Sequence, residues 1–220
     1  MTSRTDLSDR PTQGTHMRSG FRWLPVVVAA VVALACTDST GSNGGGEVPI
    51  DSLHILRLAD NSPPLATDSV SFYAVYGQQR EGTISFLGGE DFLTFKVDDF
   101  SLFKAPDGSL YGPGDSVLIT IKVIAPDSFF FDFKPAGLQF NPVRPAELKL
   151  EYGHAGNQVQ GDLNDDNVVD SEDEEIETLL HIWIQQAAGD PFVKLAVLAE
   201  LELDEIEAEI PHFSRFALAY

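Results

Sequence analysis

The chain has 220 residues, a formal net charge of -20 and a hydrophobic share of 43% that includes 15 phenylalanines. So acidic a surface repels phosphates and anionic lipid heads, which excludes nucleic-acid binding, and the apolar content excludes a disordered chain. The single cysteine excludes an intramolecular disulfide.

The first predicted element is a leader for export. Leu24 to Ala35 is an uncharged, apolar run of twelve residues that follows Arg18 and Arg22. At about 1.5 Å per residue, a helix of that length is shorter than the ~30 Å hydrocarbon layer, so the run is typical of a signal peptide and not of a membrane span. Met17 offers an alternative start with a compact signal peptide.

The segment Val32-Ala33-Leu34-Ala35-Cys36 resembles the lipobox of bacterial lipoproteins. In that family the cysteine is diacylated and becomes the mature N-terminus, so the resemblance implies lipidation at Cys36 and a membrane partner through that anchor. Thr37 after the cysteine implies sorting to the outer membrane. The alternative is an ordinary secretory signal, residues 1–36, with an incidental Cys36. Residues 37–49 are polar and glycine-rich and are expected to form a flexible tether.

Residues 50–220 are predicted to form a single, mostly β domain. Short runs rich in β-branched and aromatic residues alternate with turn signals, and several show the apolar–polar alternation of a sheet with one wet face. This pattern favours an antiparallel β-sandwich. The expected strands are Leu53–Leu58, Ser69–Tyr76, Gly82–Phe86, Phe92–Val97, Val117–Ile124, Phe129–Phe133 and Leu148–Tyr152.

Two later segments fit either helix or strand. Residues 173–186 place Ile176, Leu179 and Trp183 on one face of a helix, but Leu180 to Ile184 also alternates as a strand would. Residues 192–210 leave the same choice between helix and strand, and the composition of Leu198 to Ile210 is compatible with a helix.

Five segments of the second half resemble the ZU-five domain, the β-sandwich of netrin receptors and ankyrins that also occurs in bacterial surface proteins. They share an F-x-P-x-G-L-x-F-x-P-V turn, a strand ending in Tyr, a strand bearing aromatic residues and a terminal H-F-S. The resemblance covers roughly residues 115–220 and implies a structural and interaction module, not an enzyme. The segments are 133–143, 147–152, 180–183, 192–195 and 212–218, and the strands implied are 179–186, 191–195, 204–210 and 214–219.

One motif has the spacing of a calcium-binding loop. Twelve-residue loops offer Ca²⁺ hard oxygens from positions 1, 3, 5, 7, 9 and 12. Asn167 at position six has to tolerate a positive φ, and Val169 at position eight is expected to point inward. The predicted ligands are Asp162, Asn164, Asp166, the backbone carbonyl of Val168, Asp170 and Asp173.

Charge supports a calcium cofactor. Eight acids lie between Asp162 and Glu175, and no Lys or Arg occurs between Lys149 and Lys194. Carboxylates so close together repel one another unless a cation or solvent screens them. The D-x-N-x-D-x-x-V-D-x-x-D string resembles the calcium loop of dockerin modules and of EF-hand-like bacterial lipoproteins. The alternative is a solvated acidic hairpin loop.

The sequence therefore predicts a mostly β fold, an antiparallel β-sandwich with an inserted calcium-binding loop. The expected function is that of a lipid-anchored, calcium-binding structural or interaction module of the cell envelope, with a protein or polysaccharide ligand. One alternative is a secreted enzyme acting on polysaccharide. Another is a module that cuts itself at Phe213-Ser214, because His212-Phe213-Ser214 undergoes self-cleavage in some ZU-five relatives.

Overall fold

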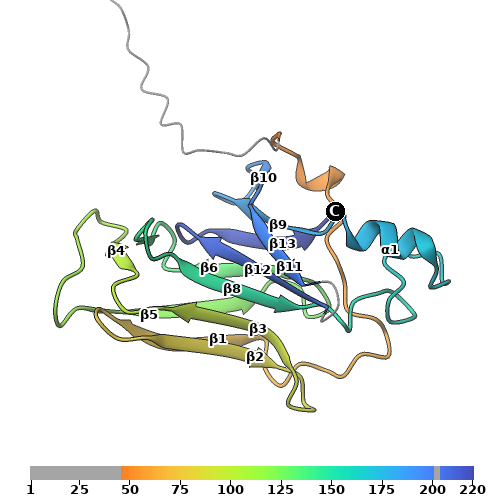
Figure 1. Cartoon of the computed structure of the whole chain (residues 1–220), viewed down its shortest axis with the longest axis horizontal. Helices are drawn as coiled ribbons and strands as arrows, with labels where there is room; N and C mark the ends of the chain where they lie inside the picture. Colours follow the sequence, from red (N-terminus) through yellow and green to blue (C-terminus); the bar gives the residue numbers. More distant parts are fainter. Residues whose placement is uncertain (1–45, 201–203) are drawn as a thin grey trace, which may run out of the picture. The chain divides into compact units, whose positions relative to one another are not determined.

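The computed structural model describes residues 46–200 and 204–220, all of them in one compact unit (Figure 1). Its strands form two antiparallel sheets that pack face to face, so the expected sandwich is confirmed. In chain order the elements are a 3-10 turn at Ile50–Ser52, β1 Ser69–Val75, β2 Arg80–Ser85, β3 Asp91–Val97, β4 Leu102–Lys104, β5 Ser116–Val123, β6 Phe130–Lys134, β7 Gln139–Phe140, β8 Ala146–Glu151, α1 Ser171–Glu177, β9 His181–Gln185, β10 Phe192–Lys194, β11 Val197–Glu200, β12 Glu205–Ile210 and β13 Arg215–Ala219.

The core lies between the two sheets. The six-stranded sheet has the order β1-β5-β6-β13-β9-β10, the five-stranded sheet has the order β11-β12-β8-β3-β2, and β4 and β7 form a separate ribbon. In β5, Ile119 and Ile121 are fully buried and alternate with outward polar residues, as a strand with one buried face requires. The largest buried side chains include many phenylalanines, and the rings of Phe133 and Phe216 meet edge to face with centroids 4.8 Å apart.

The prediction of a strand at Leu53–Leu58 is wrong. Those residues belong to a segment that we call the strap, residues 48–58. The strap ends between β13 and residues 127–129; its last residues hydrogen-bond to both of these neighbours, and Arg57 also accepts the N–H of Gly156 at 2.9 Å. Leu56 donates to the Leu218 carbonyl at 3.0 Å and accepts from the Phe129 N–H at 3.0 Å. Because neither neighbour receives a continuous ladder, the segment makes isolated bridges only.

The strap begins at the β10 edge of the same sheet. Val48 exchanges two hydrogen bonds with Phe192 of β10, at 2.9 and 2.8 Å, so pairing begins inside the range 37–49 that was expected to be a tether. Between its two ends the strap covers the face of the sheet that points away from the core, where Leu53 packs with Trp183 and Ala219. The C-terminus meets the strap, because His54 and Tyr220 exchange two backbone hydrogen bonds of 3.2 Å (Figure 1).

The structure assigns the segments whose sequence fitted both helix and strand. Residues 171–177 are helical and β9 follows at residue 181. Leu198–Ile210, which fitted both helix and strand, forms strands, because β11 and β12 lie there and pair with each other. In β12, Ile206 and Ile210 are buried whereas Glu207 is exposed, so the period is two despite a helix-like composition. No helix within 46–200 and 204–220 has the length and apolar surface that a membrane crossing requires.

Candidate functional site

The candidate site is the loop of residues 162–173, which runs into α1 near one end of the domain (Figure 1). Two glycines shape its entry. A Cβ on Gly156 would lie 2.2 Å from the Val159 carbonyl oxygen, so only glycine fits there. Gly161 has a φ of +89°, in the left-handed region that glycine adopts without steric cost. After these turns comes Asp162, which is fully buried.

Asp162 organises the first half of the loop. Its Oδ1 accepts the N–H of Asp166 at 3.1 Å, and its Oδ2 accepts the N–H of Asn167 at 2.9 Å. Burial of a carboxylate is costly unless it is hydrogen-bonded, so these contacts help to explain how Asp162 stays inside. Asn167 has a φ of +69°, which agrees with the positive φ predicted for this position.

Two successive Asx turns continue the loop. The Oδ1 of Asn164 accepts the N–H of Asp166 at 3.0 Å, and the Oδ1 of Asp166 accepts the N–H of Val168 at 2.8 Å. Turns of this kind hold side-chain oxygens in place against the local backbone. The inward orientation predicted for Val169 is wrong, because its side chain is 56% exposed.

Asp173 closes the loop onto its own start. It is 3% exposed, and its Oδ1 accepts the N–H groups of Leu163 at 2.7 Å and Asn164 at 3.3 Å. Its Oδ2 accepts the N–H of Asp170 at 2.8 Å, while Asp170 accepts from Glu172 at 2.8 Å. Asp170 and Asp173 thus form a capping box that starts α1. One carboxylate joins both ends of the loop.

The acidic loop has no basic partner within the described part of the chain. None of the ion pairs among the described residues of the chain involves a residue between 162 and 175, although this stretch holds eight acids. The guanidinium of Arg57 is already paired with Asp127. That hydrogen bond is the main cause of the raised pKa of Arg57, and the carboxylate of Asp165 contributes less.

The loop also contacts the C-terminus and the strap, which sequence reasoning missed. The Tyr220 hydroxyl donates to the Leu163 carbonyl at 2.9 Å, and the Tyr220 ring stacks on His54 at a centroid distance of 5.1 Å. Burial raises the pKa of Tyr220, and the carboxylates of Asp165, Asp173 and Asp162 raise it further. No local signal could have found Tyr220, because 57 residues separate it from Leu163.

The predicted ligands of the loop are all hard oxygen donors. Carboxylate, amide and carbonyl oxygens suit Ca²⁺, whereas Zn²⁺ prefers nitrogen and sulfur ligands. Each carboxylate oxygen has about two acceptor sites, so Asp162, Asp166 and Asp170 retain acceptor capacity beyond the bonds described above. Among the residues that the structure describes, no three His, Cys, Asp or Glu side chains are grouped as a metal site would group them.

The residues of the proposed self-cleavage lie elsewhere, at the start of β13. The Phe213 carbonyl accepts the Gly137 N–H at 3.2 Å, and burial lowers the pKa of His212. However, the buried Ser214 hydroxyl donates to the Gln185 carbonyl, so in this structure it is directed at a neighbouring strand.

Comparisons with protein-family models, with curated proteins and with solved structures give no match. The predicted lipidation residue, Cys36, lies outside the described residues. The assignment of function therefore depends on the chemistry of the site alone.

Proposed function

We propose that this chain is a lipid-anchored, calcium-binding β-sandwich that serves as a structural or interaction module of the cell envelope. The observation that supports calcium most directly is the pair of carboxylates on Asp162 and Asp173, which are buried in a stretch of eight acids without a basic partner among the described residues. A divalent cation would offset this charge. The residues that would hold it are Asp162, Asn164, Asp166, Asp170, Asp173 and the carbonyl of Val168.

The proposed role of calcium is structural. The loop touches α1 through Asp173 and the C-terminal strand through Tyr220, so an ion that orders the loop would also fasten these two elements. A single extracellular site of this type is expected to bind calcium with a dissociation constant of about 10⁻⁴–10⁻³ M. The ZU-five-like and dockerin-like character of the chain is part of the same proposal.

Calcium binding can be tested on the full-length protein in detergent, after treatment with a chelator. At 10 mM Ca²⁺ the expected stabilisation is roughly 1.4–2.7 kcal/mol, which for a domain of this size is a rise in Tm of about 3–11 °C. Asp162→Asn is expected to abolish the rise. Asp107→Asn is the matched control, because Asp107 is an exposed aspartate that also accepts a backbone N–H, from Ser109 at 2.9 Å.

Terbium provides a second readout that reports location. Tb³⁺ replaces Ca²⁺ in oxygen sites, and its emission is sensitised by a nearby tyrosine such as Tyr220. We expect calcium to displace the emission and Tyr220→Phe to weaken it while the calcium-dependent rise in Tm remains. A parent protein whose Tm does not change with calcium, or an Asp162→Asn variant that responds like the parent, contradicts the site.

The anchor is tested separately. Cys36→Ser is expected to move the protein from the membrane fraction to the soluble fraction and to remove the mass of the lipid from the mature protein. Retention of the variant in the membrane would show that another segment holds the chain there.

A further inference from the structure

The outer faces of the two sheets carry charges of opposite sign. Along each strand, side chains alternate between the core and the outer face, so burial and strand register identify the outward positions. We call the part of the six-stranded sheet that the strap leaves uncovered the basic face, and its outward residues include Tyr73, Leu118, Lys122, Asp132, Lys134 and Arg215. We call the outer side of the five-stranded sheet the acidic face, and its outward glutamates are Glu81, Glu147, Glu151, Glu205, Glu207 and Glu209.

The basic face has an excess of cations, although the whole chain has 14 Lys and Arg against 34 Asp and Glu. Lys122, Asp132 and Arg215 form one row across β5, β6 and β13, and Lys134 is the next outward residue of β6. The Asp132 carboxylate is shared, because it lies 3.3 Å from the Lys134 ammonium and 3.8 Å from the Arg215 guanidinium. One carboxylate between two cations leaves this row positively charged.

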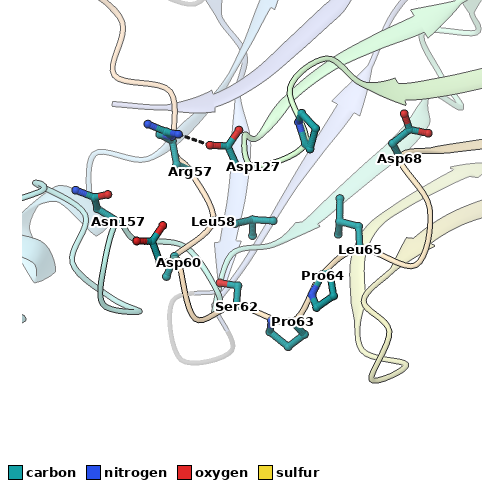
Figure 2. A pocket seen from close by; sticks show the side chains of 12 residues that line it. Arg57, Leu58, Asp60, Ser62, Pro63, Pro64, Leu65, Asp68, Asp127 and Asn157 are labelled. Carbon is teal, nitrogen blue, oxygen red and sulfur yellow. Dashed lines mark hydrogen bonds and ion pairs between the residues drawn. The ribbon is translucent and has the colours of Figure 1, made fainter.

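A further acid lies at the rim of the basic face. Asp68 directly precedes β1, and its carboxylate is 3.9 Å from the Lys122 ammonium, with both side chains more than half exposed. Figure 2 shows Asp68 beside a cavity of about 410 Å³ that Leu58 and Asp60 also line, with its carboxylate turned away from Leu65. With Asp68 included, three cations still stand against two acids.

Apolar surface is exposed beside these cations. Tyr73 of β1 and Leu118 of β5 are direct partners in the strand register, and they are 61% and 46% exposed. Ser71 and Thr120 follow on the same two strands, and their hydroxyls are hydrogen-bonded at 2.8 Å. Tyrosine and arginine are enriched where proteins meet, so the basic face has the composition of an interface.

The acidic face has the opposite balance. Its six glutamates are accompanied by two outward lysines, Lys96 of β3 and Lys149 of β8. Each lysine ammonium is already paired with a glutamate of the same face, at 3.0 Å for Lys96 and at 2.9 Å for Lys149. Glu207 and Glu209 are exposed, and within residues 46–200 and 204–220 they make no ion pair.

We infer that copies of this chain associate through these faces, with the basic face of one copy on the acidic face of the next. Long-range repulsion between the copies is screened beyond about 8 Å at physiological ionic strength, so the charges in direct contact determine the orientation. Because the two faces differ, the contact is heterologous and repeats from copy to copy. Neither face includes a residue of the loop 162–173, so the association is independent of calcium.

The size of the basic face sets the strength of this contact. Its strands are β1, β5, β6 and the start of β13, which at about 4.8 Å per strand and 3.3 Å per residue give an area of roughly 19 Å by 17 Å. Contacts of this size belong to the small, transient class of interfaces. The expected association is therefore weak and reversible.

Sedimentation equilibrium of the full-length chain tests the association. The chain carries Cys36→Ser, so that neither lipid nor detergent contributes to the measured mass, and a chelator is present. At 0.15 M salt the weight-average mass is expected to rise with protein concentration up to about 1 mM, and in 1 M salt it should return toward that of the monomer, because salt screens contacts between exposed charges. A protein that stays monomeric at 1 mM in 0.15 M salt overturns the inference.

Charge reversal separates this contact from general repulsion. Lys122→Glu with Lys134→Glu reverses the basic face, and Glu207→Lys with Glu209→Lys reverses part of the acidic face. Each pair alone is expected to weaken association at least tenfold, because a face then meets one of like charge. The second pair lowers the net negative charge by four, so general repulsion alone would make that variant associate more strongly, and such a result contradicts the inference.

Mixing the two variants provides the decisive measurement. Association should return in the equimolar mixture, because every contact between unlike variants joins a positive face to a negative one. Arg80→Glu with Lys104→Glu is the matched control for the basic face, since it makes the same change of charge on β2 and β4 outside both faces, and it should change association less than twofold. A mixture that stays monomeric, or a control that weakens association as much as the basic-face pair, overturns the inference.

Discussion

Asp173 is the side chain on which the folding of the acidic loop most depends. Asp173→Ala removes the acceptor of three backbone N–H groups, those of Leu163, Asn164 and Asp170, at a position that is 3% exposed. Loss of a capping residue costs about 0.5–2 kcal/mol, and each further buried donor left without a partner costs about 1–3 kcal/mol. Because the long bond to Asn164 contributes least, we expect a total loss of about 3–4 kcal/mol in the free energy of unfolding.

The assay is equilibrium unfolding in urea, followed by circular dichroism in the presence of a chelator. Asp173→Asn keeps one carbonyl oxygen, so it should retain the bonds to Leu163 and Asn164 and lose only about 1–2 kcal/mol. Asp107→Ala removes an exposed aspartate that caps a turn and should be clearly less destabilising than Asp173→Ala. If Asp173→Ala is no more destabilising than Asp107→Ala, the loop does not depend on this carboxylate and the reasoning fails.

Three further predictions follow from other contacts. The folded-state pKa of Tyr220 is raised, mainly by burial, so its contribution to stability is complete below about pH 10 and is lost as the pH rises toward that raised pKa; Tyr220→Phe should flatten the alkaline limb of a plot of stability against pH. Gly156→Ala places a Cβ 2.2 Å from a carbonyl oxygen and should cost about 3 kcal/mol or more in urea unfolding, whereas Gly88→Ala, with nothing within 4 Å, should be nearly neutral. The bond Phe213–Ser214 should stay intact, because the serine hydroxyl donates to Gln185, and a C-terminal fragment in the intact mass spectrum would contradict this.

Local sequence patterns predicted most strands correctly, and they failed at segments whose secondary structure is determined by tertiary contacts. The alternation in β5 and β8 predicted their buried faces correctly, because each strand has one face on the core. Leu53–Leu58 shows a similar pattern but lies between two neighbours, and only the fold determines that it shares its hydrogen bonds. The glutamates of β12 favour a helix by composition, whereas pairing with β8 and β11 makes it a strand.

The candidate site was predictable to a similar degree. Spacing predicted the positive φ of Asn167 correctly, because it depends on the local chain, and the ligand roles of the six residues from Asp162 to Asp173 stay a prediction. The same spacing was wrong about Val169, whose side chain is exposed. The contact with Tyr220 and the cavity beside Asp60 arise from segments far apart in the sequence, so no motif could indicate them.

The pairing of Val48 with β10 determines how the domain would respond to mechanical tension applied through its N-terminal side. Tension on the chain ahead of residue 48 reaches the fold first through two hydrogen bonds to Phe192. If they part, the strap can peel back as far as Leu53 and uncover Trp183, which belong to a cluster separate from the main core, before Leu56 of the main core is reached. In a domain held by its N-terminus, we expect the hydrogen bonds at this edge to break under tension before the sandwich itself unfolds.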